Sequence, residues 1–140
     1  MWQTIGIGPF LAVQIPITLI AGSIGVWLFY VQHQFEDTYW KEHRDWDYFA
    51  AGLQGSSHYA LPKLLQWFTA NIGFHHIHHV SSKIPNYRLP ECFSKHPELQ
   101  RVTSLTLRQS LGCVRLALWD EEQERLIRFR DLKALAGNAV

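Results

Sequence analysis

One long apolar run dominates the beginning of the chain. Residues 9–31 comprise 23 residues with a single strongly polar side chain, Gln14. As a helix the run would extend about 34 Å, because each residue adds about 1.5 Å and the hydrocarbon layer of a bilayer is about 30 Å thick. A secretory signal would carry basic residues first and a shorter apolar stretch. The pattern therefore predicts one transmembrane helix over residues 9–31.

The residues after this run mix aromatic and charged side chains. Over residues 37–49 this mixture indicates a helix that lies on the membrane surface and is capped by Asp37 or Thr38. Residues 52–57 contain two glycines and two serines, which are typical of a turn.

Two later segments have apolar residues at spacings of three and four. Residues 61–74 are predicted to form a helix, and a second helix is indicated over residues 107–118. Residues 115–129 alternate in a way that fits a β-hairpin nearly as well. The predicted class is mainly α and integral to a membrane, with interfacial helices and a short C-terminal hairpin as an option. The organisation expected is a span (9–31), a polar part (32–133) and a tail (134–140).

Charge is placed asymmetrically along the chain. All 13 lysines and arginines lie at or after Lys41, and residues 1–35 contain no charged side chain. By the positive-inside rule, the C-terminal part faces the cytoplasm. A net charge of +1 gives no indication of a nucleic-acid partner. The two cysteines, Cys92 and Cys113, lack metal-site spacing and are interpreted as free thiols in a reducing compartment.

Four of the eight histidines fall within five residues, His75-His76-Ile77-His78-His79. On a helix, His75, His78 and His79 share one face, and neutral imidazole is a common ligand for iron and zinc. A buried cluster without a metal would leave polar atoms unpaired, so the ligand interpretation is preferred to a solvated cluster. On a helix, His76 points about 100° away from His75. It is a weaker candidate, either as a ligand or as a residue that hydrogen-bonds and orients the ligands.

A further histidine, His33, lies where the predicted span meets water. It is the candidate for an additional metal ligand, the alternative being an interfacial side chain exposed to solvent. Nearby Glu36 fits a carboxylate ligand or base less well than a surface acid at a helix end.

The sequence around these histidines resembles that of the membrane fatty acid desaturases. It is closest to the C-terminal part of the acyl-lipid delta-12, or omega-6, type. The resemblance covers about residues 10–132 and rests on six stretches: Phe29–Glu36, Gly55–Pro62, Gln66–Phe68, Asn71–Val80, Ile84–Tyr87 and Leu118–Glu122. The histidine cluster followed by Ile-Pro-Asn-Tyr is the most specific of them.

This resemblance implies a di-iron centre and a lipid-modifying reaction. His75, His78 and His79 correspond by position to the family's third histidine box, and His33 to the additional ligand. The reaction implied is the dioxygen-dependent removal of two hydrogens from a membrane lipid or other acyl substrate. The electrons would come from a ferredoxin or a b-type cytochrome.

The first two histidine boxes of that family lie N-terminal to these stretches and are absent from this sequence. Four candidate histidines cannot complete a two-iron site, so the chain is expected to be a C-terminal fragment, inactive alone, that associates with further desaturase spans. Two alternatives stay open. One is a non-catalytic membrane remnant that pairs with a full-length relative. The other is a small membrane hydrolase that holds one zinc on the same four histidines.

Overall fold

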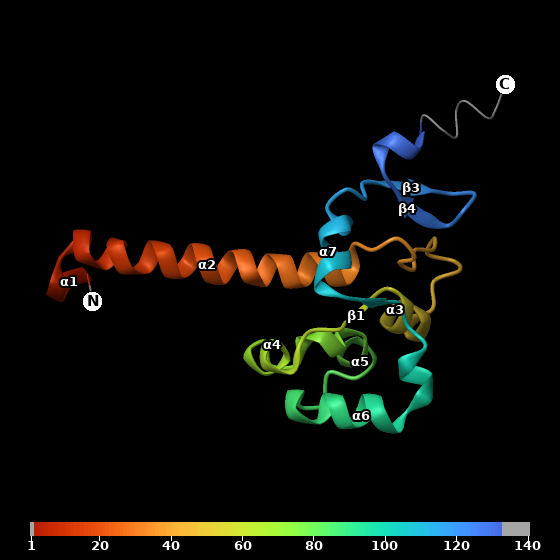
Figure 1. Ribbon diagram of the computed structural model, residues 1–140, viewed down its shortest axis with the longest axis horizontal. Coiled ribbons are helices and arrows are strands. Elements are labelled where there is room, and N and C mark those ends of the chain that lie inside the picture. The colour runs from red at the N-terminus through yellow and green to blue at the C-terminus, as the bar shows by residue number, and fades with distance from the viewer. Residues whose placement is uncertain (1, 133–140) are drawn as a thin grey trace. The chain divides into compact units, whose positions relative to one another are not determined.

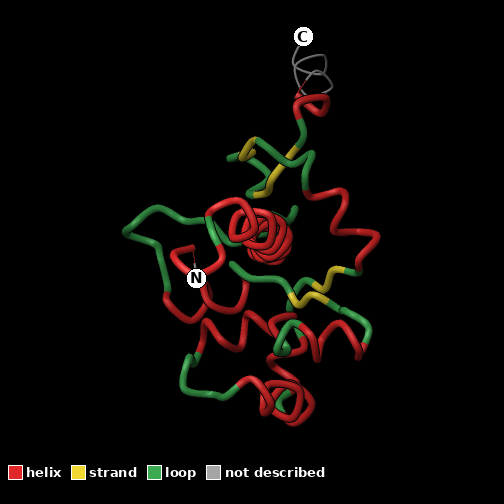
Figure 2. The backbone as a smooth tube through the Cα atoms, turned by 90° about the vertical axis from the view of Figure 1, so that its left-hand side faces the viewer, coloured by secondary structure: helices red, strands yellow, loops and turns green. Residues whose placement is uncertain are grey.

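The computed structural model describes residues 2–132, which are built mainly from helices and loops with a few very short strands (Figures 1 and 2). The chain divides after Tyr30 into two compact units, Met1–Tyr30 and Val31–Val140. In chain order the elements are α1 (Trp2–Ile5), α2 (Ile7–His33), α3 (Tyr48–Gln54), β1 (His58–Tyr59), α4 (Lys63–Phe68), η1 (Ile72–Phe74), α5 (His75–Val80), η2 (Asn86–Arg88), α6 (Leu89–Lys95), η3 (Pro97–Gln100), β2 (Ser104–Leu105), α7 (Leu107–Cys113), β3 (Leu118–Asp120) and β4 (Arg125–Ile127).

The long helix α2 confirms the predicted helix over residues 9–31 and extends it at both ends. Its apolar side chains are exposed, with Ile7 at 63% and Val26 at 70% of their full accessibility. Among the described residues, α2 is the one helix long and apolar enough to cross a membrane, judged by length and composition. Pro16 lies inside it, as spans tolerate where neighbouring groups satisfy the freed carbonyl.

The second unit has a small core built around α5. Ile77 of α5 packs with Leu89 and Leu99, and partly buried apolar residues surround them: Leu53, Phe74, Ile84, Cys92 and Phe93. Beside this core, β1 and β2 pair in parallel with His58 opposite Ser104. One face of α5 is thus held by burial, which leaves its other face available for chemistry.

The helix predicted over residues 37–49 was wrong. Residues 38–47 form an irregular loop with a turn at residues 43–45, and the helix, α3, begins only at Tyr48. Its N-cap is Asp47, whose carboxylate accepts a hydrogen bond from the Ala50 amide at 2.7 Å. The Tyr39 hydroxyl accepts from the Asp47 amide at 3.0 Å and donates to the Asp45 carbonyl at 3.2 Å, which stabilises this loop.

The continuous helix predicted over residues 61–74 was also wrong. The segment breaks after α4, where Ala70 and Asn71 both adopt left-handed backbone conformations with φ of 52° and 59°. The apolar side chains of α4 point outward: Leu64 is 66% exposed, Phe68 is 68% exposed, and Gln66 between them is buried. Gln66 donates through Nε2 to the Tyr59 carbonyl at 3.0 Å. The inward side of α4 is therefore its polar side.

Replacing Ala70 with glycine should stabilise the second unit. The left-handed conformation costs an alanine about 1 kcal/mol that glycine does not pay, while glycine loses slightly more chain entropy on folding. The expected gain is about 0.5–1 kcal/mol in the free energy of unfolding, measured by denaturant titration in detergent micelles. As a control, Ala51→Gly inside α3 should lower stability by a similar amount. A loss of stability in Ala70→Gly would contradict the assignment of strain to this turn.

The C-terminal part resolves the ambiguity of residues 115–129 in favour of the hairpin. The second helix, α7, begins after a capping box made by Thr106 and Gln109. It ends at Cys113, earlier than expected. Strands β3 and β4 then pair in antiparallel register, with Leu118 opposite Ile127. Cys92 and Cys113 are free thiols, as expected. The expected tail, residues 134–140, lies outside the described residues.

Candidate metal centre

The histidine-rich helix α5 is positioned by a tight turn that only glycine fits. A Cβ at Gly73 would overlap Gln66 Nε2 and the Tyr59 carbonyl oxygen. The turn Ile72–Phe74 therefore lies directly against the Gln66–Tyr59 hydrogen bond, and α5 begins at the next residue. Downstream, Tyr48 donates its hydroxyl hydrogen to the His79 carbonyl at 3.0 Å, so α3 supports the end of α5.

His76 lies on the side of α5 that faces the core. It is fully buried, and its Nε2 lies 3.1 Å from the Leu99 carbonyl, which fixes that nitrogen as the donor. The structure thus places His76 in the core, outside the group formed by His33, His75 and His79. Burial, followed by repulsion from His58, lowers the pKa of His76 to about 4, so the ring is neutral at physiological pH.

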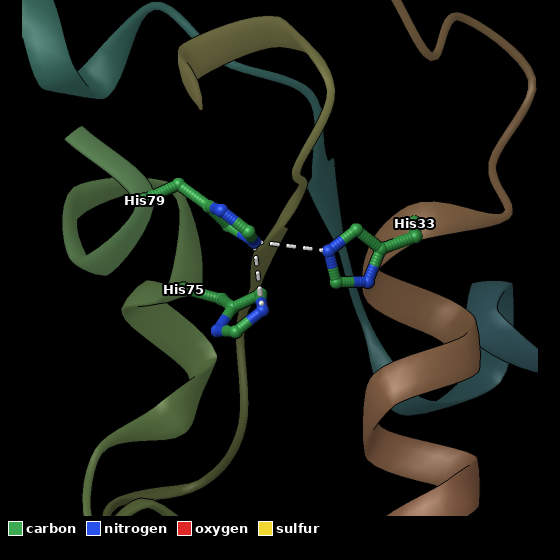
Figure 3. A group of neighbouring side chains, drawn as sticks. All are labelled: His33, His75 and His79. Carbon is green, nitrogen blue, oxygen red and sulfur yellow. Dashed lines mark hydrogen bonds between the residues drawn. The ribbon is translucent and has the colours of Figure 1, made fainter. Parts of the chain in front are cut away.

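Three of the four predicted ligands converge on the opposite side of α5. His75 and His79 project from this helix toward His33 at the end of α2 (Figure 3). His79 Nε2 lies 3.0 Å from His33 Nε2 and 3.1 Å from His75 Nε2. The three ligand atoms all lie within 4.8 Å of one another.

The hydrogen-bond contacts among these three rings all meet at one nitrogen, His79 Nε2. His79 Nε2 is close to two other Nε2 atoms, but a neutral ring nitrogen either donates one hydrogen or offers one lone pair. A metal ion would use the lone pairs of all three Nε2 atoms at once, which hydrogen bonds among the rings do not. Two nitrogens bound to one metal ion at about 2.1 Å and at right angles would lie about 3 Å apart. The separations of 3.0 and 3.1 Å from His79 Nε2 to the other two nitrogens match that arrangement.

His78 does not join the group formed by His33, His75 and His79. Its ring stacks beside His75, with ring centres 5.7 Å apart and planes 18° from parallel, and its side chain is exposed. Positions three and four residues after His75 diverge by about 100° on a helix. His79 turns toward His33, so His78 points elsewhere and is available to a different partner.

The environment keeps the rings of His75 and His79 neutral. Burial, followed by repulsion from His79, His33, His78 and His76, lowers the pKa of His75 to about 3. Burial and the neighbouring rings also lower the pKa of His79. A neutral imidazole is the form that binds a metal, and His75 and His79 are in this form at physiological pH.

The stability of the metal-free chain should fall in acid. The pKa of His75 is lowered from 6.5 to about 3 and that of His76 to about 4. Between pH 6.5 and about 3 the unfolded chain therefore binds more protons than the folded chain, and folding becomes less favourable as pH falls through that window. Denaturant midpoints at successive pH values measure this slope. His75→Asn should flatten it, and a midpoint independent of pH below 6.5 would contradict it.

Two residues that sequence reasoning missed lie next to His33. Ser56 is buried, with Oγ 3.4 Å from His33 Nε2, and Gln32 is buried with neither amide atom hydrogen-bonded to the described residues. His75 Nδ1 is likewise buried without a partner there. In the sequence, the one signal for either residue is that Gln32 directly precedes His33.

The segment that follows His33 is held by the C-terminal hairpin, β3–β4. Gln34 Nε2 donates to the Leu116 carbonyl just before β3 at 2.9 Å, and the Leu126 amide donates to the Glu36 carbonyl at 2.8 Å. The Glu36 carboxylate forms an ion pair with Arg125 at 2.8 Å. Glu36 therefore faces the hairpin and not the three histidines. Further along, Lys41 pairs with Glu124, and Trp40 packs against Trp119 with ring centres 5.7 Å apart.

Comparison with known proteins identifies the family. A sequence model described as fatty acid desaturase matches residues 1–110. The chain belongs to the fatty acid desaturase family. It is 52% identical over 132 residues to a fatty acid desaturase of Bacillus subtilis (strain 168), an alignment that covers 94% of this chain. The chain spans 36% of the length of that relative. No solved structure matches the chain.

Membership in this family indicates which class of chemistry the clustered histidines would serve. The family implies an oxidoreductase that acts on lipid, and α2 is a candidate membrane helix consistent with it. The predicted resemblance to desaturases is thereby confirmed at the level of the family. The three histidines that converge in space are drawn from two of the stretches that carried the resemblance, around His33 and around His75.

Proposed function

We propose that this chain supplies one part of the di-iron centre of a membrane fatty acid desaturase that introduces a double bond into acyl chains. The observation that carries the proposal is the convergence of the Nε2 atoms of His33, His75 and His79, with separations of 3.0 and 3.1 Å. These residues would hold one iron. His78, which points away from them, would serve the second iron together with histidines outside this chain.

Iron bound at such a centre would supply the activation of dioxygen that an unactivated carbon–hydrogen bond requires. The chain's own residues hold neutral imidazoles in place. His76 and Ile77 anchor the buried side of α5, and Tyr48 fixes its end. The hairpin contacts at Gln34 and Glu36 hold the backbone that follows His33. Ligands fixed in this way lose little freedom when they bind a metal.

The placement in the membrane follows from α2 and the charges. We propose that residues 9–31 span the bilayer and that residues 32–133 face the cytoplasm, because every lysine and arginine lies on that side of the span. The substrate would be a membrane acyl lipid, as for desaturases of the acyl-lipid delta-12 type. The electrons would come from a ferredoxin or a b-type cytochrome. The remaining ligands and spans would come from desaturase sequence outside this chain.

A hybrid desaturase tests this proposal. This chain would replace the corresponding segment of the Bacillus subtilis relative, to which it is 52% identical. The hybrid is expected to bind iron and to desaturate membrane lipids, and His78→Ala should abolish desaturation. The control is His43→Ala, since His43 is an exposed histidine outside the cluster. Full desaturation by His78→Ala would overturn the assignment of this residue.

Metal analysis of the same hybrid separates desaturation from the zinc alternative. Three imidazoles are also a donor set of catalytic zinc sites. The desaturase proposal expects iron in the purified hybrid and loss of activity when iron is removed. One zinc per chain with no iron would support a hydrolase, and no metal at all would support a non-catalytic remnant.

A further inference from the structure

A cavity of about 530 Å³ opens beside the segment that follows His33. Its wall begins at Phe35, two residues after His33, and continues along β2, α7 and the end of the hairpin. Cavities of about 300–1,000 Å³ are typical of sites for small organic ligands. None of the charged residues that line this cavity belongs to the group formed by His33, His75 and His79.

The charged residues of the cavity leave an excess of positive charge. Arg108 of α7 and Arg128, next to β4, both line it, and neither guanidinium forms an ion pair or hydrogen bond with a described residue. Glu36 is already neutralised by Arg125 at 2.8 Å. Asp37 is the remaining carboxylate, so two guanidinium groups stand against one acid. Such an excess attracts an anion.

Apolar side chains form part of the wall, together with the polar residues Thr103, Ser104 and Gln109. Phe35 is 1% exposed and Leu116 is 7% exposed, and both line the cavity beside Leu105. A ligand that fits must combine an anionic group with an apolar body. Guanidinium groups match the oxygens of a phosphate in pairs, which favours phosphate over a simple halide or a single carboxylate.

A second groove of about 380 Å³ continues from the first. The two share Glu36, Leu116 and Arg128. The second adds Arg125, which is paired with Glu36, and the ion pair of Arg130 with Asp131. Arg128 thus lies where the two grooves meet. A continuous groove of this kind accommodates a ligand larger than an inorganic ion.

We propose that this cavity binds the phosphate group of the molecule that carries the acyl chain, with Arg108 and Arg128 as its phosphate contacts. The inference rests on the proposed desaturase function for the identity of the acyl chain, but the cavity and its arginines are independent of the histidines. A phospholipid and a soluble phosphate-bearing carrier share this chemistry, and binding experiments distinguish the two.

The test compares probes that differ by a phosphate. The full chain in detergent micelles would be titrated with phosphatidic acid, with diacylglycerol of the same acyl chains, and with coenzyme A. Phosphatidic acid is expected to bind more tightly than diacylglycerol. Arg108→Gln and Arg128→Gln should each weaken phosphate binding about tenfold, because each removes a charge-assisted contact. Arg115→Gln is the matched control, since Arg115 is exposed and lines neither groove.

Each outcome decides the proposal. Arginine-dependent binding of phosphatidic acid supports a lipid carrier, and arginine-dependent binding of coenzyme A alone supports a soluble carrier. Equal binding of phosphatidic acid and diacylglycerol with no binding of coenzyme A overturns the proposal, as does equal weakening in Arg115→Gln. Both cavity variants should leave the iron content of the hybrid unchanged. Loss of iron in His79→Ala with intact phosphate binding would therefore concern the metal centre alone.

Discussion

Replacing His79 with alanine should remove iron from the hybrid desaturase while the fold is retained. His79 Nε2 contacts both His33 Nε2 and His75 Nε2, so its loss removes the nitrogen that lies between the other two. Its side chain is exposed, so truncation leaves no cavity in the core. Iron affinity and desaturation should fall about a hundredfold or more, since even residues behind metal ligands contribute 10- to 100-fold. Iron analysis, activity and circular dichroism together measure the change.

Two further histidine variants make this result specific. His43→Ala should keep both iron and activity, because His43 is exposed and outside the cluster. His76→Ala should instead destabilise the whole second unit, since it removes a buried ring and its hydrogen bond to Leu99. Iron retained at the normal content in His79→Ala would refute the proposed ligand set.

Replacing Gly73 with alanine should strongly destabilise the second unit, although it adds only a single methyl group. The new Cβ would overlap Gln66 Nε2 and the Tyr59 carbonyl oxygen, one of which is backbone that cannot move aside cheaply. The turn before α5 would have to shift and break the 3.0 Å hydrogen bond between Gln66 and Tyr59. Overpacking costs about 1–3 kcal/mol and a buried unpaired carbonyl costs about 1–3 more. Denaturant titration of the chain in micelles measures the loss.

Gly112→Ala is the matched control for this substitution. A Cβ at Gly112 meets no atom within 4 Å, and the residue lies inside helix α7. Alanine is favoured over glycine in a helix by about 0.5–1 kcal/mol, so the control should be neutral or stabilising. Similar stabilities for the Gly73 and Gly112 variants would mean that the turn before α5 is not closely packed.

The elements predictable from sequence were those with strong local patterns. The apolar run of residues 9–31, the histidine helix and the alternation in residues 115–129 each carried a signal within a few residues. The start of α3 did not, because Asp37 and Asp47 are both good caps and only the loop held by Tyr39 selects the second. The break at Ala70 had no signal either, since alanine normally favours helix.

Periodicity identified the apolar side of α4 but gave no direction for it. Spacings of three and four place Leu64 and Phe68 on one face, yet the pattern does not say whether protein or lipid covers that face. In α4 the polar Gln66 is inward, because Tyr59 offers it a buried carbonyl. The same limit applies to the metal centre. The spacing allowed both His78 and His79 to join His75, and only the position of His33 selects His79.

The contacts between the hairpin and the segment after His33 also bear on how the protein is made. Glu36 and Arg125 are 89 positions apart, and Lys41 and Glu124 are 83 apart. Such distant pairs form late, because a long loop must close before they contribute any stability. On the ribosome, α5 can fold before β3 and β4 have emerged, whereas the segment after His33 cannot be held until they do. His33 should therefore be the last of the three converging ligands to reach its final position, and iron loading should follow the synthesis of the hairpin.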